Sequence, residues 1–72
     1  MSIGTIRGKH GNYPVEVING AVYYRDSSGR TVGTGFTTGQ KSGNFIGPDG
    51  SLHDQQSALR SIQSRYDQGR YS

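Results

Sequence analysis

The feature that most constrains the fold is the dipeptide Asn19-Gly20, which lies between two runs in which apolar and polar residues alternate. A two-residue type I′ hairpin turn requires positive φ at both central positions, and Asn and Gly adopt that conformation at the lowest cost. Such a turn fixes the register of its two strands, so that Val15 faces Tyr24. The apolar side chains that then share one face of the hairpin are those of Val15, Val17, Val22 and Tyr24.

A second turn is predicted at Asp26-Ser27-Ser28-Gly29, where a type I turn ends in a left-handed glycine and leaves a one-residue bulge. With this bulge Tyr24 faces Val32, Phe36 joins the apolar face, and the Tyr23 ring covers Gly33. Residues 15–36 therefore form a three-strand antiparallel meander. Its opposite side, called the second face below, carries Glu16, Ile18, Tyr23, Arg25, Gly33 and Gly35.

The segments around this meander give weaker signals. Ser2 to Arg7 is predicted to be a first strand, although Ile3 and Ile6 do not alternate with a period of two. Residues 37–44 are polar and glycine-rich, which predicts an exposed, mobile loop. Residues 44–46 are predicted to form a short strand, followed by a turn at 47–50.

From Ser51 the apolar period changes from 2 to about 3.6. Ser51 and Asp54 have the spacing of a capping box, so a helix is predicted over 52–67, ending near Gly69 and followed by a frayed tail at 69–72. Its apolar stripe consists of Leu52, Leu59, Ile62 and Tyr66.

These elements predict a single α+β domain over residues 1–72: a small antiparallel meander sheet of three to five strands, at about 2–46, with one C-terminal amphipathic helix packed on one face. Whether the first strand and residues 37–46 fold over the second face and close a small barrel is left open. The predicted core comprises Ile6, Val15, Val17, Val22, Tyr24, Val32, Phe36, Phe45, Leu52, Leu59, Ile62 and Tyr66.

Composition limits the classes of protein that fit. A chain of 72 residues buries only about 60% of its unfolded surface, so stability is expected to be marginal and a homo-oligomer would increase it. The sequence has no cysteine, no apolar run typical of a signal peptide and none long enough to span a membrane. We therefore expect a cytoplasmic protein that does not contact membranes.

No motif in the sequence predicts an enzyme. Residues 33–42 superficially resemble a phosphate-binding loop, but three residues separate Gly35 from Gly39, and Gln40 precedes Lys41 where that loop needs Lys directly after its second glycine. The two histidines have no recognisable metal-ligand spacing with the acids. We expect no catalytic residue, no metal and no cofactor.

Two binding functions remain. The first is an accessory module, such as an inhibitor or structural component of a phage or plasmid, that occupies the surface of a partner protein. Small and apolar positions on the second face predict the contact residues Ile18, Tyr23, Arg25, Gly33 and Gly35. The alternative is a small basic nucleic-acid-binding protein, because the formal charge is +3 and cations lie near aromatic residues. Its predicted phosphate contacts are Arg7, Lys9, Arg25, Arg30 and Lys41.

Overall fold

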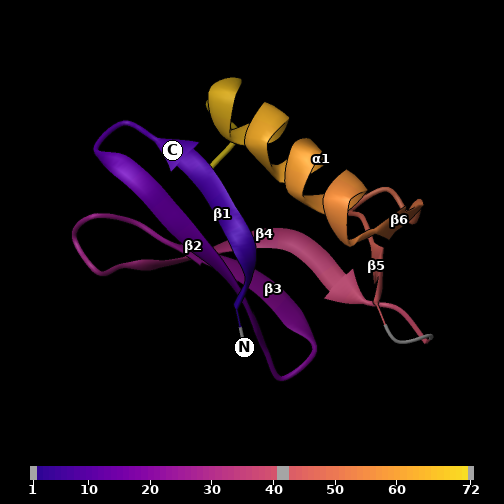
Figure 1. The fold of residues 1–72 in the computed structure, drawn as a ribbon. Coiled ribbons are helices and arrows are strands. Elements are labelled where there is room, and N and C mark those ends of the chain that lie inside the picture. The colour runs from indigo at the N-terminus through magenta and orange to yellow at the C-terminus, as the bar shows by residue number, and fades with distance from the viewer. Residues whose placement is uncertain (1, 41–42, 72) are drawn as a thin grey trace.

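The structure is a computed structural model that describes residues 2–40 and 43–71. Six strands form one antiparallel sheet whose spatial order is the chain order. The strands are β1 (Ser2–Gly8), β2 (Gly11–Ile18), β3 (Ala21–Arg25), β4 (Thr31–Thr38), β5 (Asn44–Ile46) and β6 (Leu52–Asp54). One helix, α1 (Gln55–Asp67), contacts β1, β5 and β6 and lies beside the curled sheet (Figure 1). The α+β class, the meander and the C-terminal helix are confirmed, but the sheet has six strands rather than three to five.

Both predicted hairpin turns are present. Asn19 and Gly20 have φ values of 51° and 80°, and Val15 pairs with Tyr24 as the type I′ turn requires. In the second turn Gly29 has a φ of 86°, and the pairs Tyr24–Val32 and Tyr23–Gly33 form as the bulged register predicts. The residues of these two turns therefore set the register of β2 against β3 and of β3 against the first part of β4.

A bulge within β4 was not predicted. Ala21 pairs with Thr37, two residues beyond its regular position, and Gly35 adopts a φ of 84°. At this bulge the Thr34 hydroxyl donates to the carbonyl of Val22 at 2.8 Å, which gives the buried threonine a hydrogen-bond partner. The glycine supplies the positive φ that a side chain would resist.

The irregular spacing of Ile3 and Ile6 is explained by a bulge in β1. Ser2 pairs with Glu16, whereas Gly4 pairs with Val15, so one extra residue is accommodated in β1. This shift changes the alternation of side chains between faces, and both isoleucines are buried. A period-2 reading of this segment misses Ile3, which is a core residue.

The helix begins later than predicted. Leu52–Asp54 pairs with β5 as strand β6, and Asp54 is the N-cap residue, whose carboxylate accepts a hydrogen bond from the Ser57 amide at 2.8 Å. Ser51 is not the cap, because its hydroxyl donates to Asp49 and also contacts His53. As part of an edge strand, Leu52 is 74% exposed, so its assignment to the core was wrong.

The core lies between the concave side of the sheet and α1. The prediction was correct for most of its members but omitted Ile3, Tyr13 and Ala58, and it placed Leu52 there wrongly. The buried apolar residues are Ile3, Ile6, Tyr13, Val15, Val22, Tyr24, Phe36, Phe45, Ala58 and Ile62, and Val17, Val32, Leu59, Tyr66 and Tyr71 pack against them.

Helix α1 runs along the outer edge of β1. Gln55 donates to the Ile3 carbonyl at 2.6 Å, and Gln63 bonds both the amide and the carbonyl of Arg7. The two glutamines are eight helical residues apart, about 12 Å, and Ile3 and Arg7 are four strand residues apart, about 13 Å. The spacing along the helix therefore matches the spacing along the strand. Their amides satisfy backbone groups that a further strand would otherwise pair.

The chain end folds back onto the sheet. Gly69, with a φ of 77°, follows the helix, and the Arg70 amide donates to the carbonyl of Arg65, as in a Schellman motif. This reversal brings the Tyr71 hydroxyl to 3.0 Å from the Thr34 carbonyl, to which it donates. The prediction of a frayed tail was therefore wrong at Tyr71.

The loop between β4 and β5 is shorter than predicted. Thr37 and Thr38 belong to β4 and pair with Ile46 and Phe45. Strand pairing therefore continues into the polar segment, because the backbone supplies the hydrogen bonds whatever the side chains are. Lys41 lies outside the described residues.

Candidate functional site

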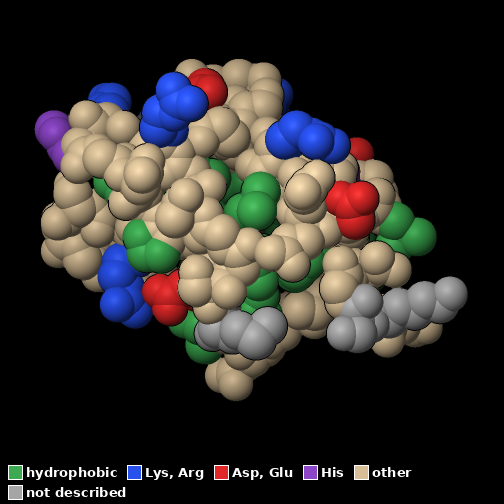
Figure 2. Space-filling model, viewed as in Figure 1, with side chains coloured by type: hydrophobic (Ala, Val, Ile, Leu, Met, Phe, Trp, Pro, Cys, Tyr) green, Lys and Arg blue, Asp and Glu red, His purple; other side chains and the backbone are tan. Residues whose placement is uncertain are grey.

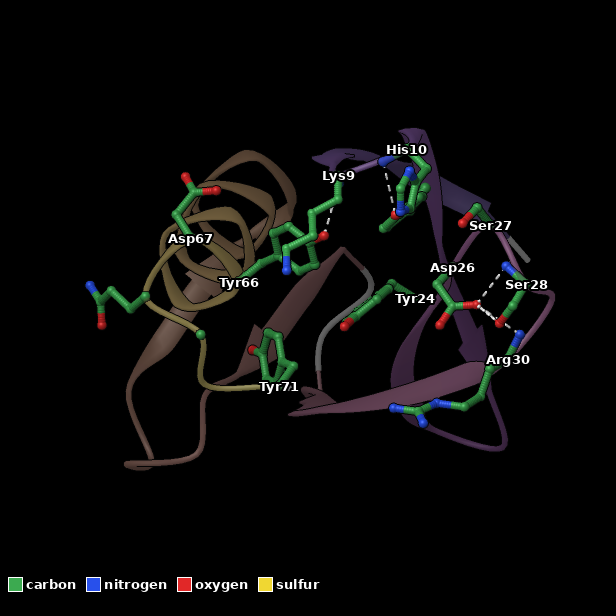
Figure 3. Close-up of a pocket in the computed structure, with 13 residues that line it drawn as sticks. Lys9, His10, Tyr24, Asp26, Ser27, Ser28, Arg30, Tyr66, Asp67 and Tyr71 are labelled. Atoms are coloured by element: carbon green, nitrogen blue, oxygen red, sulfur yellow. Dashed lines mark hydrogen bonds between the residues drawn. The ribbon is translucent and has the colours of Figure 1, made fainter.

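A pocket of about 630 Å³ opens where the C-terminal end of α1 meets the β1–β2 and β3–β4 turns (Figure 3). We call it the tyrosine pocket, because four of the five tyrosines line it: Tyr13, Tyr24, Tyr66 and Tyr71. Its volume lies within the range of about 300–1,000 Å³ that is typical of ligand sites.

The four rings form one packed cluster. Tyr13 and Tyr24 are nearly parallel, with ring centroids 6.0 Å apart, and Tyr66 meets both edge-on at 5.9 and 5.7 Å. The ring of Tyr71 lies 5.7 Å from that of Tyr24 at an angle of 54°. Offset and edge-to-face pairs are the favourable geometries for aromatic rings, so this wall of the pocket is preformed.

Three of the four hydroxyls are bonded to the backbone. Tyr13 accepts from the His10 amide at 3.1 Å, Tyr66 accepts from the Lys9 amide at 2.9 Å, and Tyr71 donates to Thr34. The Tyr24 hydroxyl has no hydrogen-bond partner among residues 2–40 and 43–71, and Figure 3 shows it directed into the pocket. It is the tyrosine hydroxyl of the pocket that is available to a ligand.

The tight β1–β2 turn depends on Gly8. The Tyr13 ring covers this glycine so closely that an added Cβ would overlap the ring. The missing side chain therefore lets Tyr13 lie against the backbone and bond the His10 amide. Lys9 and His10, the two residues of the turn, are held at the rim of the pocket.

The pocket is lined by equal numbers of basic and acidic side chains, with histidine left aside. Lys9 and Arg30 are opposed by Asp26 and Asp67, so with His10 neutral the formal charge of the lining is zero. Asp26 Oδ1 accepts three hydrogen bonds, from the Ser28 amide and hydroxyl and from the Arg30 amide, at 3.0, 2.6 and 3.0 Å. These bonds, that of the Ser28 hydroxyl above all, lower the pKa of Asp26.

Burial governs the ionisation of two of the tyrosines. It raises the pKa of Tyr24, and the nearby Tyr66 and Asp26 act in the same direction. Burial also raises the pKa of Tyr71, although Arg65 acts against it. Both phenols therefore stay neutral at physiological pH and retain their protons as hydrogen-bond donors.

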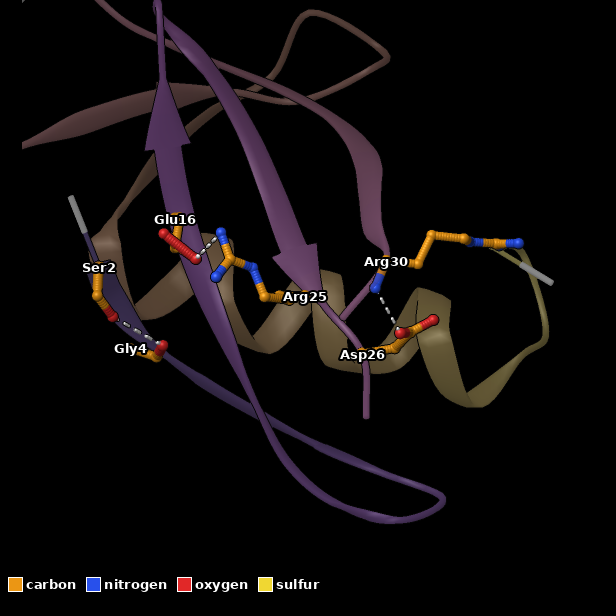
Figure 4. A network of polar contacts seen from close by, with 6 residues as sticks. All are labelled: Ser2, Gly4, Glu16, Arg25, Asp26 and Arg30. Carbon is orange, nitrogen blue, oxygen red and sulfur yellow. Dashed lines mark hydrogen bonds and ion pairs between the residues drawn. The ribbon is translucent and has the colours of Figure 1, made fainter. Parts of the chain in front are cut away.

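The residues predicted to contact a partner protein lie on the second face, away from this pocket. The Tyr23 ring lies over Gly33, where an added Cβ would be 3.7 Å from it, and Ile18 is 41% exposed. Arg25 forms an ion pair with Glu16 at 3.5 Å (Figure 4). Gly35 is approached by the β5–β6 turn, because an added Cβ would lie 3.1 Å from Pro48.

The residues predicted to contact nucleic acid are not brought together. Lys9 and Arg30 line the tyrosine pocket, whereas Arg25 is paired on the second face, and Lys41 lies outside the described residues. The Arg7 side chain is exposed, while its backbone is bonded to Gln63. On the face seen in Figure 2, basic side chains are scattered and acidic ones lie among them.

Comparison with known proteins gives no relative. The chain matches no protein-family model, no curated protein and no solved structure. The helix in the described part of the chain is not long and apolar enough to cross a membrane. Within the same residues, no group of three or more His, Asp or Glu side chains is placed to hold a metal ion.

His53 belongs to a separate network of side-chain hydrogen bonds, away from the tyrosine pocket. Its Nε2 lies 2.8 Å from the Ser51 hydroxyl, and its Nδ1 lies 2.9 Å from that of Ser57. Ser51 in turn donates to Asp49 at 2.6 Å. This network packs around the buried Gly47, whose missing side chain leaves room for it. It joins the β5–β6 turn to the first turn of α1.

Sequence reasoning missed the pocket because its tyrosines are distant in the chain. The sequence predicts that Tyr24 and Tyr66 are core residues and that Tyr71 belongs to a frayed tail, and no pattern groups them with Tyr13. The sequence signal that was available is the number of tyrosines, which is high for 72 residues without tryptophan. Their clustering depends on how α1 docks.

Proposed function

We propose that this protein is a non-enzymatic binding module that holds a segment of a partner protein in the tyrosine pocket. One observation carries the proposal: four tyrosine rings form a preformed wall, and one hydroxyl, that of Tyr24, points inward without a partner among the described residues. Tyrosines contribute large contact areas at low cost in conformational entropy and are enriched in protein–protein contacts.

The charge of the pocket favours a protein segment over a nucleic acid. A nucleic-acid strand presents one negative charge per nucleotide, and its binders neutralise several phosphates with Lys and Arg. The lining offers two such cations, Lys9 and Arg30, together with two acids. A mixed set of this kind suits a segment with few net charges.

The second face is a competing site for the same function. It exposes Ile18 and leaves Tyr23 half-buried, but its cation Arg25 is already paired with Glu16. The tyrosine pocket offers both a hollow and an unpaired polar group, and we therefore prefer it.

Nucleic acid remains the second candidate, because Lys9 and Arg30 lie beside aromatic rings. Binding of a single-stranded oligonucleotide would then weaken steeply with salt concentration. A titration with oligonucleotides at low and near-physiological salt distinguishes this candidate from the preferred one.

Selection of peptides from a random displayed library on the immobilised protein tests the preferred function. Tyr24→Phe removes only the unpaired hydroxyl, so it leaves the fold intact, and Tyr23→Phe is the matched control on the second face. We expect Tyr24→Phe to weaken the selected peptides by about threefold to tenfold, the value of one hydrogen bond. Loss of binding on Tyr23→Phe but not on Tyr24→Phe would move the site to the second face.

A further inference from the structure

Three hydrogen-bond donors reach into the tyrosine pocket from different elements. They are the ammonium of Lys9 on the β1–β2 turn, the hydroxyl of Tyr24 on β3, and the guanidinium of Arg30 at the end of the β3–β4 turn. In Figure 3 the Lys9 and Arg30 head groups lie on either side of the Tyr24 hydroxyl.

None of these three groups has a hydrogen-bond or ion-pair partner in the described part of the chain. Arg25 shows the contrast, because its guanidinium lies 3.5 Å from the Glu16 carboxylate. Cations and hydroxyls that line a cavity without a partner are complementary to an anion, since charge-assisted hydrogen bonds are about twice as strong as neutral ones.

The two acids of the pocket form no ion pair with these donors in the described part of the chain, although, besides the Ser28 hydrogen bonds, the charge of Arg30 helps to lower the pKa of Asp26. Asp26 Oδ1 accepts hydrogen bonds from the amide and hydroxyl of Ser28 and from the amide of Arg30. Asp67 accepts from the side-chain amide of Gln63 at 3.0 Å. Figure 3 shows the Asp67 carboxylate directed away from the rings. Their charges still limit how much negative charge the pocket accepts, so a single monoanion fits better than a dianion such as phosphate.

We infer that the tyrosine pocket binds the C-terminal carboxylate of a partner chain whose last residue is aromatic, with Lys9, Tyr24 and Arg30 on the carboxylate and the tyrosine rings around the side chain. The inference rests on the proposed function and specifies the group that is recognised. A C-terminal aromatic residue carries a carboxylate and a ring close together. It can therefore contact the donors and the tyrosine rings of one pocket at the same time.

Four small probes separate the parts of this inference in NMR titrations of the intact protein. They are N-acetylphenylalanine, its C-terminal amide, phenyl phosphate, and N-acetyl-aspartyl-phenylalaninamide, which moves the carboxylate to a side chain. We expect N-acetylphenylalanine to shift the ring signals of the pocket tyrosines, with a dissociation constant in the millimolar range typical of a ligand of this size. The amide should bind at least about tenfold more weakly, because it lacks the charge.

Three exposed cations, Lys9, Arg25 and Arg30, and the unpaired hydroxyl of the buried Tyr24 provide variants that leave the packing of the core unchanged. Lys9→Gln and Arg30→Gln should each weaken N-acetylphenylalanine by about fivefold or more, and Tyr24→Phe by about threefold. Arg25→Gln removes the same charge from the second face and should leave binding unchanged. An equal effect of Arg25→Gln and Arg30→Gln would show only a loss of overall charge and would overturn the inference.

The remaining outcomes identify which statement fails. If the acid and its amide bind equally well, the pocket accepts aromatic groups but the carboxylate inference is wrong. If the aspartyl probe or phenyl phosphate binds more tightly than N-acetylphenylalanine, the C-terminal source is wrong. If no probe perturbs the pocket tyrosines, the proposed function itself fails.

Discussion

The side-chain amide of Gln63 makes the two hydrogen bonds to Arg7 that a neighbouring strand would make: its Oε1 accepts from the Arg7 amide at 2.6 Å, and its Nε2 donates to the Arg7 carbonyl at 3.0 Å. Because β1 is the first strand of the sheet, its outer edge would otherwise present unpaired backbone groups. The helix thus protects the edge strand with a side chain.

Gln63→Ala should therefore lower the free energy of unfolding by about 1–2 kcal/mol, since two partly exposed hydrogen bonds are lost. Urea denaturation measures the difference. Gln56→Ala is the control, because Gln56 is an exposed residue of the same helix and has no hydrogen bond to β1 in the described structure. Equal stabilities of the two variants would contradict the role assigned to Gln63.

Two strand glycines under tyrosine rings should respond differently to alanine. At Gly8 an added Cβ overlaps the Tyr13 ring, so Gly8→Ala must displace that ring and should cost about 1–3 kcal/mol. At Gly33 the Cβ would lie 3.7 Å from Tyr23, an ordinary contact, so Gly33→Ala should change stability by less than about 0.5 kcal/mol. Denaturation curves and the Tyr13 ring signals test both expectations; a neutral Gly8→Ala would show that Tyr13 can move freely.

The two leucines of the predicted helical stripe should differ in how much they contribute to the stability of the fold. Leu59 packs against the core and lies next to Gly4, where an added Cβ would be 2.6 Å from its Cδ1, whereas Leu52 is 74% exposed. Leu59→Ala should cost about 2 kcal/mol or more, and Leu52→Ala less than about 0.5 kcal/mol. Comparison of the unfolding midpoints of the two variants tests this difference. A large loss of stability in Leu52→Ala would place that side chain in the core.

Stability should fall in acid through Asp26. Its pKa in the folded protein is lowered by the Ser28 and Arg30 hydrogen bonds, so its contribution is complete above the unfolded value of about 3.9 and is lost as pH falls through the folded pKa. Asp26→Asn should flatten the pH dependence of the unfolding midpoint in this window. Ser28→Ala, which removes the strongest of these donors, should raise the pKa of Asp26 in a carboxyl NMR titration; an unchanged pKa would exclude the hydrogen bond as the cause.

Only part of the candidate site could be predicted from the sequence. Lys9 and Arg30 were selected as cations near aromatic residues, and both line the pocket. Their grouping with Tyr71 was not predicted, because it depends on the reversal at Gly69 and on the bond from Tyr71 to Thr34, residues 37 positions apart. No short-range pattern encodes a contact of that separation.

The sequence by itself determined the two hairpin turns and the register around them. The positive φ at Asn19, Gly20 and Gly29 is a property of a few adjacent residues, and it sets the pairing of residues 15–18 and 21–33 without help from the rest of the chain. Only the tertiary structure decided that Leu52–Asp54 is a strand and that the tyrosines gather in one pocket. In those places the pairing of β6 with β5 and the docking of α1 on the sheet outweigh the local helical pattern, because backbone pairing and burial stabilise more than propensity does.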